Sequence, residues 1–177
     1  GPQVDDEVKL TLEEWKERLQ PQLWRRRVLP KSIATVDFEP TSHPQAGEPV
    51  WESDSGISIM RVGPAKSAET IVHWMLDQKH WSPKRIQQRA ETWPGATHYF
   101  VAWRGCDWKS SKYDELKTAK KQTQYLRRFH LIGESMEQLA LCDFLTAWKW
   151  ISDRGDGPLD LAATGRETTL AMLATLL

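Results

Sequence analysis

The chain has 177 residues, a length that suits one domain better than two. Its 24 Lys and Arg balance its 24 Asp and Glu, whereas a nucleic-acid-binding domain usually carries a basic excess, and no apolar run approaches the ~20 residues of a membrane-spanning helix. The composition therefore argues against a nucleic-acid partner and against a membrane partner.

The first 47 residues are predicted to precede the main domain. Residues 11–27 carry apolar side chains at helical spacing, with Thr11 placed to cap the helix and Pro21 placed to kink it. The segment 30–49 is rich in Pro, Ser, Thr and Gly, which predicts a linker or an extended arm. We divide the chain into residues 1–2, a scar left by removal of an expression tag, residues 3–47, an N-terminal helix and linker arm, and residues 48–177, the main domain.

Strands and helices alternate along the main domain. Two apolar runs, 50–52 and 57–62, flank a turn-forming cluster and predict a β-hairpin, and residues 70–75 and 97–103 have the composition of strands. Between them, Ser82 can cap a helix that begins at Pro83 and ends near residue 93. The polar segment 107–121 is predicted to be a surface loop that enters a helix.

The helix after Ser135 gives the clearest signal. Ser135 and Gln138 match the capping-box pattern, and apolar residues then recur at steps of three and four as far as Ile151. A strand at 158–163, a tight turn at 164–166 and a helix at 167–177 follow. This order predicts an α/β fold with a mostly parallel sheet and flanking helices.

Segments of the main domain resemble α/β-hydrolases of the bacterial acetyl xylan esterase or dienelactone hydrolase-like type. EPVWESDSGISI (48–59) resembles the opening hairpin of such proteins, and VAWRGCD (101–107) resembles a strand that runs into a loop. LIGESM (131–136) with DFLTAWKW (143–150) resembles the segment before the nucleophile strand, which LDLAATG (159–165) matches. The resemblance implies a partial α/β-hydrolase fold preceded by the N-terminal helix and arm. It is compatible with a secreted or periplasmic location, and the two cysteines, Cys106 and Cys142, leave the compartment open.

The resemblance places Glu167 at the position of the nucleophile. This fold holds its serine in G-x-S-x-G on a sharp strand-to-helix turn, and the chain has GRETT at 165–169 instead. We interpret Glu167 as part of a capped first helical turn, with a covalent carboxylate nucleophile as the minor alternative. The runner-up nucleophile is Ser135 in GESME, which we interpret as the helix cap.

No histidine follows either candidate nucleophile. The fold orders its triad as nucleophile, acid and histidine along the chain, but the last histidine is His130. We therefore expect no catalytic residue in this chain by itself. The other histidines form no metal-ligand pair and the phosphate-binding glycine loops are absent, so no metal and no cofactor are expected; we interpret these histidines as core or surface residues: His43, His73, His80 and His98.

These observations predict a non-catalytic or incomplete α/β-hydrolase-like domain that acts as scaffold or interaction part of a larger esterase-like protein. Two alternatives stay open: a carbohydrate (acetyl xylan-type) serine esterase whose acid and His come from another chain or a missing C-terminal half, and a carbohydrate-binding module that uses exposed rings among the 10 Trp. Strand 158–163 would be an exposed edge. The expected partner that covers it is the remainder of the same protein or a second copy, and a polysaccharide is a further candidate ligand.

Overall fold

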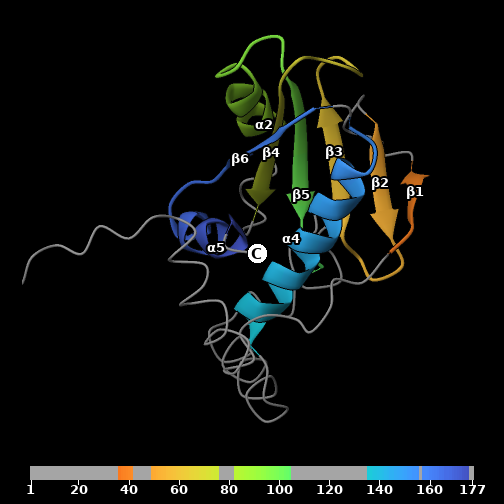
Figure 1. The fold of residues 1–177 in the computed structure, drawn as a ribbon, viewed down its shortest axis with the longest axis vertical. Helices are drawn as coiled ribbons and strands as arrows, with labels where there is room; N and C mark the ends of the chain where they lie inside the picture. The colour runs from red at the N-terminus through yellow and green to blue at the C-terminus, as the bar shows by residue number, and fades with distance from the viewer. Residues whose placement is uncertain (1–35, 42–48, 76–81, 105–134, 156, 176–177) are drawn as a thin grey trace, which may run out of the picture.

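A mixed six-stranded sheet forms the centre of the molecule, as the computed structural model in Figure 1 shows. The structure describes residues 36–41, 49–75, 82–104, 135–155 and 157–175. The predicted helix at 11–27 and the predicted loop at 107–121 lie outside these residues, as do His43, His80, His130 and Cys106. The elements in chain order are β1 (Phe38–Thr41), β2 (Val50–Ser53), β3 (Ser58–Val62), β4 (Thr70–Met75), α2 (Pro83–Ala90), β5 (Thr97–Ala102), α4 (Met136–Ser152), β6 (Leu159–Ala162) and α5 (Arg166–Thr175).

The strands lie in the order β1-β2-β3-β5-β4-β6. The pairs β1–β2, β2–β3 and β3–β5 are antiparallel, whereas β4 pairs in parallel with both β5 and β6. Consequently β2, β4, β5 and β6 point in one direction, and β1 and β3 point in the other. Parallel neighbours need crossover connections, and α2 supplies the one from β4 to β5. The predicted α/β class, with a mostly parallel sheet and flanking helices, is confirmed for the described part of the chain.

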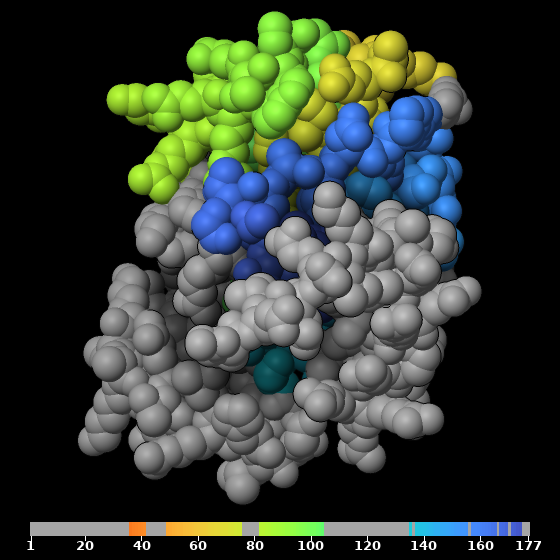
Figure 2. Space-filling view, turned by 60° about the vertical axis from the view of Figure 1, so that its left-hand side comes forward, coloured from red at the N-terminus to blue at the C-terminus, as the bar shows by residue number. Residues whose placement is uncertain are grey.

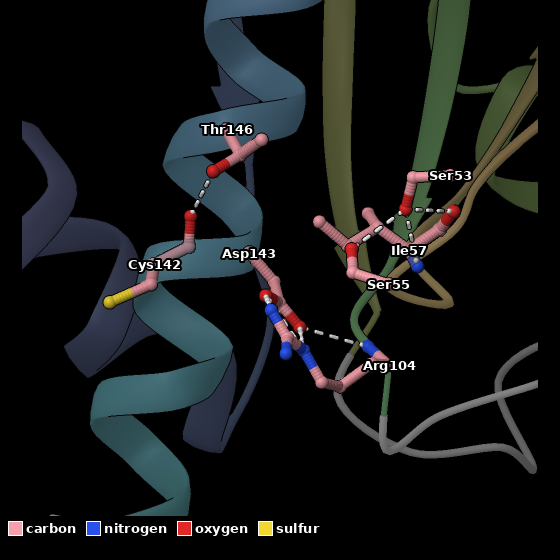
Figure 3. Close-up of polar contacts among 7 residues, drawn as sticks. All are labelled: Ser53, Ser55, Ile57, Arg104, Cys142, Asp143 and Thr146. Carbon is pink, nitrogen blue, oxygen red and sulfur yellow. Dashed lines mark hydrogen bonds and ion pairs between the residues drawn. The ribbon is translucent and has the colours of Figure 1, made fainter. Parts of the chain in front are cut away.

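The predicted hairpin is formed by β2 and β3. Ser53 closes its turn, because its Oγ accepts the N–H of Ile57 at 3.0 Å and its backbone N–H donates to the carbonyl of Ile57 at 3.0 Å. The hydroxyl of Ser55 lies 2.9 Å from that of Ser53 (Figure 3). Gly56 has a φ of 88°, which a residue without Cβ adopts at little cost. The turn residues of the sequence therefore form the turn in the structure.

Strand β1 arises from the segment that the composition predicts as a linker or arm. Phe38 pairs with Ser53, and Thr41 with Val50, so part of the arm belongs to the sheet. Phe38 is buried, and its ring centroid lies 5.1 Å from that of Trp150 on α4. The strand has only four residues and contains Pro40, and a proline is tolerated at the edge of a sheet because it lacks a backbone N–H. Such a short strand has no periodic signal to detect.

The core lies between the sheet and the helices on its two faces. Alternation along β4 places Val72 and Trp74 on one face and Ile71, His73 and Met75 on the other. On the first face, Trp74 stacks on Phe144 of α4 with ring centroids 4.3 Å apart, and α4 crosses this face in Figure 1. Of the residues that the sequence places on one side of this helix, Leu139 is partly buried and the following are buried: Ala140, Asp143, Phe144, Ala147 and Ile151.

Both predicted caps are present at the starts of their helices. The Oγ of Ser82 accepts the N–H of Arg85, so α2 begins at Pro83 as expected. The Oγ of Ser135 accepts the N–H of Gln138 at 3.0 Å, and α4 begins at the next residue. Helix α2 ends at Ala90, earlier than the sequence predicts, because a turn at residues 93–96 follows it, in which Ala96 donates to the carbonyl of Trp93.

Candidate functional site at the turn between β6 and α5

The turn that joins β6 to α5, residues 163–167, is called here the elbow turn. It lies at the carboxyl end of β6, beside the carboxyl end of the parallel strand β4. In open α/β sheets, ligands bind at this end of the strands. Gly165 adopts a φ of 60°, in the left-handed region, immediately before α5 begins. The sequence predicted this turn at 164–166.

The side chain of Glu167 is buried within the elbow turn. The residue is 1% exposed, and its Oε2 accepts hydrogen bonds from the backbone N–H and from the hydroxyl of Thr164, each at 3.3 Å. The same oxygen lies 3.5 Å from Nη2 of Arg89 on α2. Nη2 of Arg89 also donates to the hydroxyl of Thr164 at 2.8 Å, which closes a cycle of three side chains.

These contacts agree with the predicted cap. Glu167 reaches back three residues to a backbone donor that the first turn of a helix leaves without an intrahelical partner. Its negative charge lies where the dipole of α5 favours an anion, and Arg89 adds a full positive charge. Figure 2 shows that the atoms of α2, in green, adjoin the blue atoms around the elbow turn on one face of the molecule.

A pair of buried histidines lies on the neighbouring strands β4 and β5, and His73 shares the face of Met75, which Arg89 of α2 contacts. Nε2 of His73 on β4 and Nδ1 of His98 on β5 are 3.0 Å apart, and Nε2 of His98 lies 3.1 Å from the carbonyl oxygen of Trp93. The ring of His73 stacks on that of Phe100 with centroids 4.4 Å apart. Both histidines are core residues, one of the two interpretations that the sequence allowed.

The environment favours the neutral form of both imidazoles. Burial, followed by the charges of His98 and Arg89, lowers the pKa of His73 to about 3. Burial also lowers the pKa of His98, although the hydrogen bond to Trp93 and the charge of Glu69 oppose this shift. Sequence reasoning missed the pair. The signal was that His73 alternates with Ile71 and Met75 in an apolar strand, so that it shares their buried face.

A partly buried ion pair joins the residues after β5 to α4 (Figure 3). Asp143 is 1% exposed, and its Oδ2 accepts the backbone N–H of Arg104 at 3.0 Å. Its Oδ1 accepts Nη2 of the same arginine at 2.6 Å. Arg104 and Asp143 belong to two of the segments that carry the resemblance to α/β-hydrolases, so the fold brings these segments into contact.

The described residues give little support to a metal site, a membrane-spanning helix or a sugar-binding surface. Among them, no group of three His, Cys, Asp or Glu side chains could hold a metal ion, and no helix has both the length and the apolar character of a membrane span. A sugar-stacking surface needs several exposed rings on one face, but Trp93 is the one described tryptophan with an exposed side chain. The others are buried or partly buried: Trp51, Trp74, Trp103, Trp148 and Trp150.

Comparison with known proteins finds similar solved structures at low identity. Neither a protein-family model nor a curated protein sequence matches the chain. An esterase of Pyrobaculum calidifontis is 14% identical with a TM-score of 0.40 and matches 98% of this chain and 50% of its own. A CE15 glucuronoyl esterase of Teredinibacter turnerae is 10% identical with a TM-score of 0.46 and matches 97% of this chain and 51% of its own.

A third structure, EstFA in its apo form, is 11% identical with a TM-score of 0.35, over 97% of this chain and 49% of its own. The chain thus spans about half the length of each of these proteins. The first two of these proteins are esterases.

Proposed function

We propose that this chain is a non-catalytic α/β-hydrolase-like domain that serves as scaffold or interaction part of a larger, esterase-like protein. The observation that carries the proposal is the state of Glu167 at the elbow turn. The nucleophile of this fold stands at such a turn with its reactive atom exposed. Here the corresponding side chain is 2% exposed, and its carboxylate accepts hydrogen bonds from Thr164 and forms an ion pair with Arg89.

A nucleophilic carboxylate must present an unpaired oxygen to a substrate carbon. Oε2 of Glu167 already accepts two hydrogen bonds and faces a guanidinium group. Its withdrawal from these contacts would take the carboxylate away from the Arg89 guanidinium and from the N–H and hydroxyl of Thr164, a loss of about 1 kcal/mol for each hydrogen bond. The contacts therefore favour a structural use of this side chain.

The histidines support the same function. General-base activation of a nucleophile needs an imidazole with a nitrogen within hydrogen-bond reach of the attacking atom. His73 and His98 are buried and lie within hydrogen-bond distance of each other, and His98 is also bonded to the carbonyl of Trp93. The hydroxyl of the runner-up nucleophile, Ser135, caps α4 by accepting the backbone N–H of Gln138.

Labelling with a fluorophosphonate probe and hydrolysis of p-nitrophenyl acetate test the proposal together. The purified chain is expected to remain unlabelled, and its background hydrolysis is expected to be the same in the Glu167→Gln and Ser135→Ala variants. Robust turnover that either substitution abolishes would contradict the proposal. If turnover appears only after a second chain is added and is lost in Ser135→Ala, the alternative of a carbohydrate esterase completed in trans is supported instead.

The interaction part of the proposal concerns β6. This strand pairs with β4 on one side, and no described strand pairs with its other side. An open strand edge presents N–H and C=O groups that can pair with another strand. We place the remainder of the larger protein, or a second copy of this chain, on that edge. Light scattering across a concentration series tests the second copy, and a monomer at every concentration would rule that partner out.

The resemblance to acetyl xylan esterases and dienelactone hydrolase-like proteins makes a carbohydrate ester the substrate class proposed for the larger protein. A polysaccharide is accordingly a candidate ligand of the assembly. Titration with xylo-oligosaccharides, followed by tryptophan fluorescence, is expected to show no binding to this chain by itself, since Trp93 is the exposed tryptophan among the described residues. Saturable quenching would favour the carbohydrate-binding alternative.

A further inference from the structure

Two consecutive hydrogen bonds run from His73 through His98 to the carbonyl oxygen of Trp93, in the turn after α2. A carbonyl oxygen can only accept, so Nε2 of His98 donates to Trp93. In a neutral imidazole the other nitrogen is then an acceptor, and Nδ1 of His98 accepts from Nε2 of His73. With both rings neutral, the network assigns a proton to each of these bonds and brings no charge into the core.

These two hydrogen bonds connect three parts of the fold. His73 lies on β4, His98 on β5, and Trp93 in the turn at residues 93–96. The ring of Trp93 also lies against His73, with centroids 6.1 Å apart. The turn after α2 is therefore held to the sheet through two histidines that are 1% and 2% exposed.

We propose that the His73–His98 pair is an acid-sensitive latch, which holds the turn after α2 against the sheet while both rings are neutral and releases it when the pair takes up protons.

Protonation disfavours the closed geometry in two steps. A first proton places a cation at a buried site, and the charged group that faces His73 from α2 is Arg89, another cation. Glu69, before β4, is the acidic group that acts on His98, and it is exposed, so water screens its attraction. A second proton gives both rings two N–H groups and sets donor against donor across 3.0 Å.

The sign of the effect follows from the pKa values. The pKa of His73 is about 3 in the fold, against 6.5 for a solvated histidine, so the unfolded or opened chain binds more protons between these limits. Stability that depends on neutral His73 is complete above pH 6.5 and is lost as the pH falls towards 3. Each such histidine raises the opening equilibrium constant about tenfold per pH unit in this window.

Hydrogen–deuterium exchange at pH 7.5 and pH 5.0, corrected for intrinsic rates, tests the latch. We expect the protection of a peptide covering residues 91–99 to fall at least tenfold at pH 5.0, and that of a peptide within α4 to fall less. His73→Gln keeps an N–H near the position of Nε2 but does not titrate, so the pH dependence of peptide 91–99 is expected to flatten in this variant. Equal loss of protection in both peptides, or an unchanged pH dependence in His73→Gln, would overturn the proposal.

Denaturant unfolding from pH 7.5 to 4.5 measures the pH dependence of global stability, and this second test does not require local opening to be resolved. The slope of the logarithm of the unfolding constant against pH is expected to drop by about one proton in His73→Gln and again in His73→Gln/His98→Gln. His43→Gln, which removes a histidine outside the pair, is the matched control. A drop as large in His43→Gln as in His73→Gln would count against the latch.

Discussion

Arg104, at the end of β5, binds the buried carboxylate of Asp143 on α4 through its backbone N–H and its guanidinium group at once, at 3.0 Å and 2.6 Å. The arginine side chain is 37% exposed and that of the aspartate 1%. Removal of the carboxylate therefore takes away the acceptor of a partly buried backbone N–H, while water can solvate part of the guanidinium.

We predict that Asp143→Ala lowers the free energy of unfolding by about 2–4 kcal/mol, after allowance for the exposure of Arg104. The matched control is Asp153→Ala, which removes the acid of the exposed Lys149–Asp153 pair at the end of the same helix. Its expected cost is below about 1 kcal/mol. Urea denaturation followed by circular dichroism measures both, and equal costs would show that the Arg104 contact contributes no more than a surface pair.

The ion pair between Arg89 and Glu167 is predicted to couple in a double-mutant cycle. Glu167→Gln and Arg89→Gln should each destabilise the chain by about 1–3 kcal/mol, because each removes one charge of a pair in which the carboxylate is buried and the guanidinium is partly buried. The double variant should cost less than the sum of the two, since it leaves no isolated charge. Glu91→Gln, in an exposed contact with Gln87 after α2, is the control. Additive costs would mean that the pair does not interact.

Small carboxylates are predicted to rescue the Glu167→Ala variant. The substitution leaves Arg89 Nη2 and the donors of Thr164 arranged around the site that the carboxylate occupied. Acetate can fill this space, and a ligand that binds only the folded state raises its stability. The melting temperature of Glu167→Ala should therefore rise with acetate more than with chloride at equal ionic strength. The wild-type chain serves as control, and an equal rise in both proteins would argue against rescue.

Two glycines with similar backbone angles are predicted to respond differently to alanine. Gly63 and Gly95 have φ values of 94° and 90°, so both substitutions carry the left-handed penalty of about 1 kcal/mol. A Cβ on Gly63 would lie 2.7 Å from the carbonyl oxygen of Ala96, whereas one on Gly95 meets no atom within 4 Å. Gly63→Ala should therefore lower the melting temperature more than Gly95→Ala, and equal shifts would contradict the close approach.

The elements with strong local signals could be predicted from the sequence. Ser135 caps α4 because its hydroxyl accepts a backbone N–H of the first turn, and the residues that form this pattern lie within four consecutive positions. The strand at Thr70–Met75 has the predicted bounds, because its apolar run is bounded by polar and turn-forming residues. The strand Phe38–Thr41 was missed because its position depends on pairing with β2, a contact that its own four residues do not encode.

The candidate site could be predicted in part. The cap at Glu167 depends on residues three apart in the chain, and the sequence indicated it. Arg89 is far from Glu167 in the sequence and reaches it through the crossover that places α2 near β6. Likewise, the contact of His73 with His98 depends on the parallel register of β4 and β5, in which Ile71 lies opposite His98. Long-range pairing of this kind is set by the sheet order, which local patterns leave open.

The elbow turn also constrains how this chain could be converted into a serine hydrolase. Replacement of Glu167 by serine would supply a hydroxyl but would remove the carboxylate that the guanidinium of Arg89 and the N–H of Thr164 share. The substitution would therefore destabilise the same turn that has to hold the new nucleophile. Conversion would therefore call for a compensating change at Arg89 as well as the new serine, before any base or acid is added.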